Sequence, residues 1–92
     1  MTPPPDVVDR IRALPPGSST GTAHGRSYVC TRSDFSDGRS VKVVAEERGG
    51  PDYISLNLYH LAAGPRLFPC EMPAGKVIAF LRDFTPEIAA PK

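Results

Sequence analysis

The chain has 92 residues, a mass of 9.9 kDa and a formal net charge of +1 at pH 7. This length allows one domain, and 40% hydrophobic with 23% charged residues excludes a globally disordered chain. A charge of +1 excludes strong attraction to nucleic acid or anionic membranes through net charge alone. No apolar run is long enough to span a membrane and no leader pattern opens the sequence, so we expect a cytoplasmic protein of bacterial type without membrane partners.

Residues 1–25 are predicted to form a short helix followed by a loop. Residues 6–14 place three apolar side chains at the helical spacing i, i+4 and i+7, and two prolines then end the pattern. Residues 16–25 are small and polar with three glycines, which is typical of a connecting loop. This loop lacks the Lys-Ser/Thr pair of a phosphate-binding loop and follows a helix, so we do not expect nucleotide binding there.

Residues 26–47 carry the strongest hairpin signal. Asp37-Gly38 lies between two runs of β-forming residues and favours a two-residue turn in which both residues have positive φ. In this register Arg32 lies opposite Val43, and side chains alternate between the two faces. The more apolar face is assigned to the core and contains Tyr28, Cys30, Val41, Val43 and Ala45. This choice leaves Arg32 and Asp34 on the core side, near the hairpin tip.

Two more strands and a second helix complete the predicted fold. Residues 53–61 alternate between apolar and polar side chains, and residues 66–70 predict a short edge strand because Pro69 cannot donate a ladder hydrogen bond. Residues 73–84 have the apolar spacing of a helix. We therefore expect an α+β fold, a four-stranded antiparallel meander with a C-terminal helix packed on one face and a short N-terminal helix. Residues 26–86 form the β-β-β-β-α domain, and residues 87–92 form a loose tail.

The sheet face opposite the C-terminal helix is the candidate binding surface. Aromatic side chains on a sheet, beside basic residues, are typical of proteins that bind single-stranded nucleic acid. We predict that the binding residues are Tyr53, Asn57, Tyr59, Lys42, Arg26, Arg32 and Arg39. An ordinary solvated sheet face, a face for a protein partner and a homodimer interface all explain the same pattern.

Two cysteines and a histidine leave a catalytic alternative open. Cys30 and Cys70 are expected to be free thiols, because no export signal accompanies them. A thiol-dependent enzyme would use Cys70 or Cys30 with His60. Nothing else in the sequence has the spacing of catalytic or metal-ligating residues, so we expect a non-catalytic binding module without metal or cofactor.

Parts of the hairpin resemble a known family. The run Arg26-Ser27-Tyr28-Val29, followed by Arg32, Asp34-Phe35 and Gly38, resembles the first hairpin of the positive-cofactor-four transcriptional coactivator family. Residues 64–81 resemble the strand-to-helix passage of that family in outline, with Phe80 and Leu81 in the helix. The resemblance implies a β-β-β-β-α module that dimerises and binds single-stranded DNA. The chain also looks like short bacterial proteins from which no activity carries over.

Overall fold

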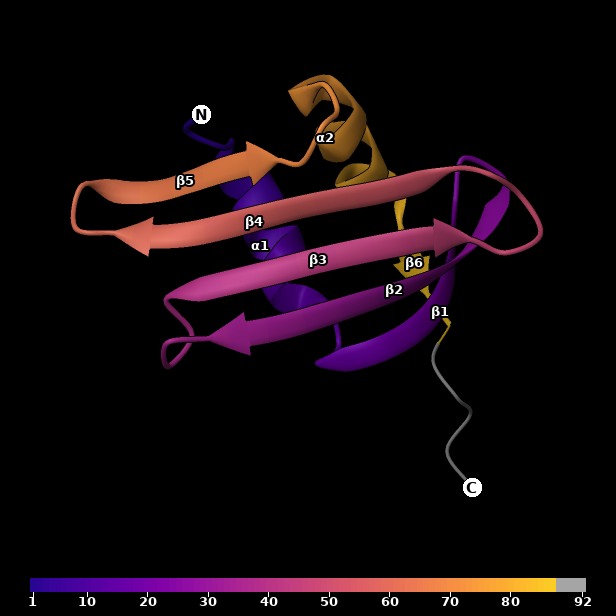
Figure 1. Cartoon of the computed structure of the whole chain (residues 1–92), viewed down its shortest axis with the longest axis horizontal. Helices are drawn as coiled ribbons and strands as arrows, with labels where there is room; N and C mark the ends of the chain where they lie inside the picture. Colours follow the sequence, from indigo (N-terminus) through magenta and orange to yellow (C-terminus); the bar gives the residue numbers. More distant parts are fainter. Residues whose placement is uncertain (88–92) are drawn as a thin grey trace.

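A computed structural model describes residues 1–87 and shows two helices packed on one face of a six-stranded antiparallel sheet (Figure 1). The helices are α1 (Pro5–Ala13) and α2 (Ala74–Asp83). The strands are β1 (Gly17–Ala23), β2 (Arg26–Phe35), β3 (Ser40–Glu47), β4 (Tyr53–Leu61), β5 (Gly64–Pro69) and β6 (Thr85–Pro86). Their order across the sheet is β5-β4-β3-β2-β1-β6. The α+β class, the meander from β2 to β5 and the C-terminal helix on one face are confirmed.

The prediction of four strands is wrong, because β1 and β6 extend the sheet beyond β2. Residues 16–25 were expected to form a loop, yet β1 pairs with β2 from Gly17 opposite Arg32 to Ala23 opposite Arg26. The glycine, serine and threonine residues of β1 carry no alternating apolar pattern. Their strand conformation depends on the neighbouring strand rather than on local propensity. β6 has two residues, which is too short to produce a sequence pattern.

Gly21 allows the C-terminal part of the described chain to approach β1 closely. A Cβ atom at this position would collide with the carbonyl oxygen of Thr85 and the ring of Phe84. Glycine inside a strand often marks such a close approach. The missing side chain therefore makes room both for Phe84 in the core and for β6 at the sheet edge.

The β2–β3 hairpin has the predicted register. Arg32 lies opposite Val43 and Cys30 lies opposite Ala45. Asp37 and Gly38 have φ angles of 56° and 84°, as a two-residue turn of this kind requires. Ser36 also has a positive φ of 54°, so three consecutive residues are in the left-handed region.

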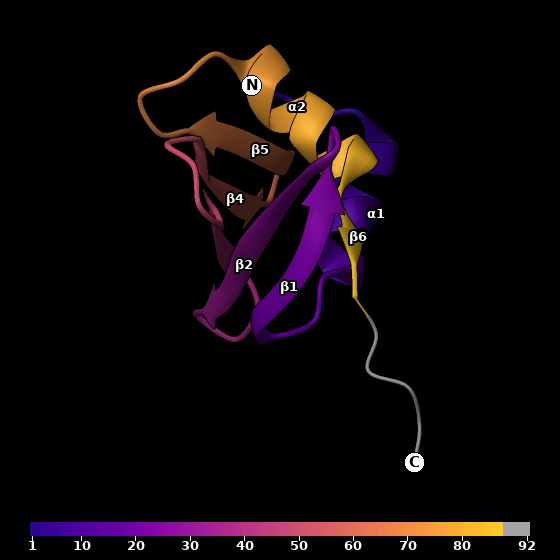
Figure 2. The same cartoon turned by 90° about the vertical axis from the view of Figure 1, so that its right-hand side faces the viewer.

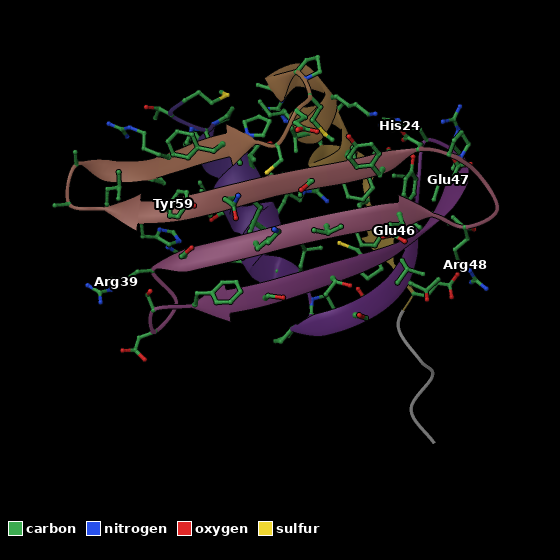
Figure 3. All side chains as sticks on the ribbon, in the orientation of Figure 1. His24, Arg39, Glu46, Glu47, Arg48 and Tyr59 are labelled. Atoms are coloured by element: carbon green, nitrogen blue, oxygen red, sulfur yellow. The ribbon has the colours of Figure 1, made fainter. Side chains whose placement is uncertain are left out.

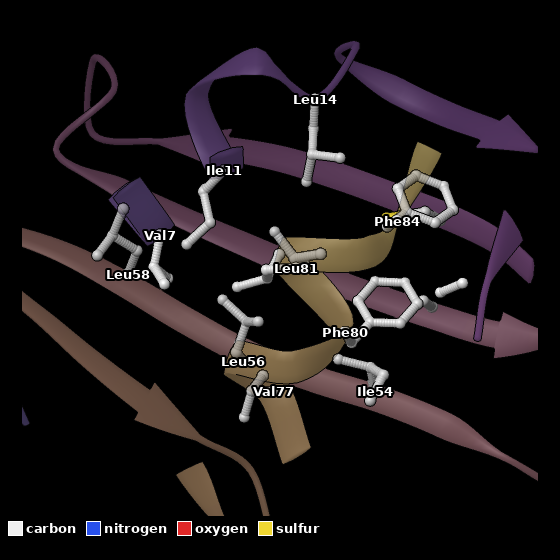
Figure 4. Packing of buried hydrophobic residues seen from close by; sticks show 14 of the residues in the cluster. Val7, Ile11, Leu14, Ile54, Leu56, Leu58, Val77, Phe80, Leu81 and Phe84 are labelled. Atoms are coloured by element: carbon white, nitrogen blue, oxygen red, sulfur yellow. The ribbon is translucent and has the colours of Figure 1, made fainter. Parts of the chain in front are cut away.

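Both helices lie on the same side of the sheet, as Figure 2 shows. In Figure 4, Val7 of α1 lies beside Leu58, whereas Val77 and Phe80 of α2 lie over Leu56 and Ile54. The apolar face assigned to the core in the hairpin is buried, which confirms that assignment. The buried hydrophobic cluster consists of Val7, Ile11, Leu14, Ala23, Tyr28, Cys30, Val41, Val43, Ala45, Ile54, Leu56, Leu58, Leu67, Val77, Phe80, Leu81 and Phe84.

The N-terminal helix is attached to the sheet, a point that its sequence left open. Its apolar stripe joins the core through Val7 and Ile11. No helix within residues 1–87 combines the length and the apolar character needed to cross a membrane. Of the tail predicted over 87–92, only Glu87 is described, and its N–H donates to the carbonyl oxygen of Thr20 at 2.7 Å. The rest of that tail lies outside the described residues.

Candidate functional site

The sheet face turned away from the helices is called the open face here. Successive side chains of a strand point to opposite faces, so the pairing registers determine which residues share it. No element within residues 1–87 packs over this face (Figure 2). From β2 to β5 its side chains are Ser27, Val29, Thr31, Ser33, Phe35, Ser40, Lys42, Val44, Glu46, Tyr53, Ser55, Asn57, Tyr59, Leu61, Arg66 and Phe68.

One end of the open face combines aromatic and basic side chains. The last rung shared by β2, β3 and β4 runs across the sheet as Phe35, Ser40, Tyr59 and then Arg66 on β5. The next rung runs as Ser33, Lys42, Asn57 and Phe68. These two rungs, together with Arg39 in the adjoining turn, are called the aromatic–basic end.

Tyr59 is held in place from one side. Its ring contacts Phe68 edge to face, with centroids 5.5 Å apart and an interplanar angle of 66°. Such a contact adds to the stability gained from burial and restricts both rings. Phe68 remains 47% exposed, so the pair is available to a ligand even though it is ordered.

The other side of Tyr59 borders a hollow. This hollow has a volume of about 360 Å³ and is lined by Phe35, Ser36, Arg39, Ser40, Tyr59, His60 and Leu61. Neighbouring strands lie about 4.8 Å apart, so β2 and β4 place Phe35 and Tyr59 about 10 Å apart with the small Ser40 between them. Two aromatic side chains thus border this hollow, with a small residue between them, and the gap is called the Phe35–Tyr59 slot.

The opposite end of the open face carries an acidic side chain beside its tyrosine. Glu46 lies directly opposite Tyr53. The Lys76 ammonium lies 5.7 Å from the Tyr53 ring centroid, but it also makes an ion pair with Asp52 at 2.7 Å. Figure 3 shows Glu46 and Glu47 at this end and Tyr59 at the other. Glu46, the one acidic side chain among the strand residues of the open face in the described chain, thus lies away from the Phe35–Tyr59 slot, whereas Asp37 lies in the β2–β3 turn beside Arg39.

The seven predicted binding residues do not all reach one surface. Four of them, Tyr53, Asn57, Tyr59 and Lys42, lie on the open face. Arg39 lies in the β2–β3 turn and lines the hollow at its end.

Arg26 and Arg32 lie on the other side of the sheet. Arg26 is paired opposite Ala23, and its Nη1 is 3.8 Å from a Glu47 carboxylate oxygen. Arg32 donates from Nη1 to the carbonyl oxygens of Arg12 and Leu14, and it makes an ion pair with Asp34 at 2.9 Å.

Three aromatic or basic residues of the aromatic–basic end were absent from the predicted set. Phe35 follows Ser33 by two positions on β2, and Arg66 and Phe68 share one face of the short strand β5. The alternation of side chains along these strands was the signal that placed them on the open face. The alternation was harder to follow at these positions, because Phe35 ends its strand and Phe68 lies next to Pro69.

The structure does not bring either cysteine to His60. Cys30 is buried on the helix side opposite Ala45, and burial raises the pKa of its thiol to about 11. Cys70 is on the open face, where its Sγ accepts a hydrogen bond from Asn57 Nδ2 at 3.4 Å. His60 is on the helix side at the far end of β4, with its ring against Arg12. The thiols are free.

Comparison of this chain with models of protein families, with curated proteins and with solved structures finds no match. The resemblance to the positive-cofactor-four family therefore stays a prediction.

Proposed function

We propose that this protein is a non-catalytic module that binds single-stranded nucleic acid at the aromatic–basic end of the open face. The observation that carries the proposal is the Phe35–Tyr59 slot, an exposed gap between two aromatic side chains with Arg39 at its border. Bases present flat π surfaces in single strands and not in a duplex. Stacking of one base on an aromatic side chain is worth about 1–3 kcal/mol and tolerates any sequence.

Charge complementarity supports the same ligand. Lys42 and Arg66 lie on the aromatic–basic end, and Arg39 lies in its turn. Within residues 1–87 none of these three side chains makes an ion pair. A strand crossing this end would meet three cations next to the aromatic rings. Three phosphate contacts correspond to a slope of about −2 for log K against log salt on a single strand.

The test is a fluorescence anisotropy titration of labelled oligothymidylate at about 20 mM and about 150 mM salt, which brackets weak and physiological screening. We expect saturable binding that weakens with salt along the slope given above. Lys42→Gln is expected to reduce the slope by about 0.7. Arg48→Gln is the matched control, because Arg48 is exposed at the opposite end of the sheet (Figure 3) and is expected to leave the slope unchanged.

The same samples distinguish the competing function of the open face. Phe35, Leu61 and Phe68 are exposed hydrophobic residues, and exposed apolar patches also mediate association between proteins. Sedimentation of the free protein as a dimer, with no oligonucleotide bound at about 20 mM salt, would overturn the proposal and assign the face to self-association. Sedimentation as a monomer that binds oligonucleotide would support it.

A further inference from the structure

A second hollow lies on the helix side of the same sheet end. It has a volume of about 350 Å³ and is lined by Arg12, Arg32, Asp37, Gly38, Arg39, Val41 and His60. Three guanidinium groups and an imidazole border this space, and Asp37 supplies the single carboxylate among the lining residues. The hollow is called the arginine hollow here.

Two of the three guanidinium groups are available to an anion. Arg32 uses four of its five N–H donors, on Asp34 and on two carbonyl oxygens of α1 and the turn that follows. Arg12 contacts the ring nitrogens of His60 at 3.2 and 3.3 Å and makes no ion pair within residues 1–87. Arg39 uses its Nε on the carbonyl oxygen of Ser36 at 3.3 Å, so both of its Nη atoms remain.

The arginine hollow and the Phe35–Tyr59 slot are adjacent. Arg39 and His60 line both of them, on either side of the sheet end. The backbone N–H of His60 donates to the backbone carbonyl oxygen of Arg39 at 2.8 Å, so the two residues are joined by a hydrogen bond. The slot occupies the last rung that β2, β3 and β4 share, so it lies at the edge of the open face next to the arginine hollow.

We propose that the arginine hollow binds a phosphate monoester and that, if the proposed function holds, this group is the terminal phosphate of the bound strand. A base in the slot places the phosphate next to it at the sheet end, within reach of Arg12, Arg39 and His60. A terminal phosphate carries about −1.5 to −2 charge and three acceptor oxygens. An internal diester carries one charge, and paired guanidinium groups favour the more highly charged group through bidentate hydrogen bonds.

The first test compares three oligothymidylates of one length, which carry a 5′-phosphate, a 3′-phosphate or two hydroxyl ends. We expect one phosphorylated form to bind about tenfold more tightly than the hydroxyl form, a difference of about 1.4 kcal/mol. Arg12→Gln removes this preference and leaves the affinity for the hydroxyl form unchanged, since Arg12 does not line the slot. Arg48→Gln keeps the preference. Equal affinity for all three strands, or loss of both affinities in Arg12→Gln, would overturn the proposal.

The second test uses inorganic phosphate alone, so it does not depend on base stacking. NMR signals of the Arg12 and Arg39 side chains and of the His60 ring should shift during a titration to about 20 mM phosphate, a range that detects millimolar binding. The shifts should disappear in Arg39→Gln and persist in Tyr59→Ala. Shifts without any oligonucleotide binding would support the phosphate site and reject the strand-binding function. Oligonucleotide binding without phosphate-induced shifts would reject the phosphate site alone.

Discussion

The guanidinium of Arg32 donates from Nη1 to the carbonyl oxygen of Leu14 at 2.9 Å, directly after the end of α1. The same nitrogen donates to the carbonyl oxygen of Arg12 at 2.8 Å. A helix of nine residues is marginal by itself, and its last carbonyl groups lack partners within the helix. Arg32 therefore joins the N-terminal helix to the hairpin, and these bonds occupy donors that a phosphate would need.

Replacing Arg32 should destabilise the protein through α1. Arg32→Gln removes hydrogen bonds to two carbonyl oxygens and to Asp34, and we expect the free energy of unfolding to fall by about 1–3 kcal/mol. Urea denaturation measures this change. Arg48→Gln replaces an exposed arginine without a side-chain partner among the described residues and should leave the midpoint in place. Equal midpoints for both variants would show that Arg32 does not hold the helix.

Leu56→Asp should prevent folding. Leu56 is 0% exposed at the centre of the sheet, beneath α2 (Figure 4). An unpaired carboxylate buried there costs several kcal/mol, comparable with the whole stability of a domain of this size. Circular dichroism and a thermal melt check this prediction. A cooperative melt close to that of the wild type would mean that the core face is assigned wrongly.

Gly38→Val should destabilise the hairpin by about 1–2 kcal/mol, because a β-branched residue resists a positive φ. Gly38 has a φ of 84°, and a Cβ atom there would meet nothing within 4 Å, so conformation alone opposes the change. Gly75→Ala is the control: Gly75 lies in α2 with equally open surroundings and without positive φ. It should be neutral or stabilising by less than about 1 kcal/mol. Similar destabilisation by both substitutions would contradict the strain explanation.

The two thiols should differ in reactivity. The Cys30 thiol is buried, and its pKa of about 11 keeps it protonated below about pH 10, whereas the thiolate is the reacting form. Cys70 is half-buried on the open face. Iodoacetamide at pH 8 should therefore modify Cys70 well before Cys30 in the native protein, and both at similar rates in urea. Mass spectrometry of tryptic peptides gives the two rates. Equal rates in the native protein would contradict the burial of Cys30.

The elements with an alternating or helical apolar pattern could be predicted from the sequence. The side chains of β4 alternate along the strand, and Asp37-Gly38 determined the register of the hairpin. β1 could not be predicted, because its strand conformation depends on pairing with β2 and on the space that Gly21 leaves for Phe84. Local sequence contains neither of these long-range constraints.

The candidate site was also predictable only in part, because local patterns determine which face of a strand a residue lies on but not which distant segments meet. Strand alternation placed Tyr59, Asn57 and Lys42 on one face. The role of Arg32 depends on where the end of α1 lies, and the adjacency of Arg12, Arg39 and His60 depends on how α1 crosses the sheet. These are tertiary relationships between segments far apart in the chain, and no local pattern of charged residues distinguishes a helix-holding arginine from a ligand-binding one.

The most direct test of base stacking in the Phe35–Tyr59 slot is the affinity of Tyr59→Ala for oligothymidylate at about 20 mM salt, where screening is weak. We expect a loss of about 1–3 kcal/mol with an unchanged melting temperature. Tyr53→Ala, which removes a 44% exposed ring beside Glu46 at the other end, should lose less. Wild-type affinity in Tyr59→Ala, or no binding by the wild type itself, would show that the Phe35–Tyr59 slot does not stack bases.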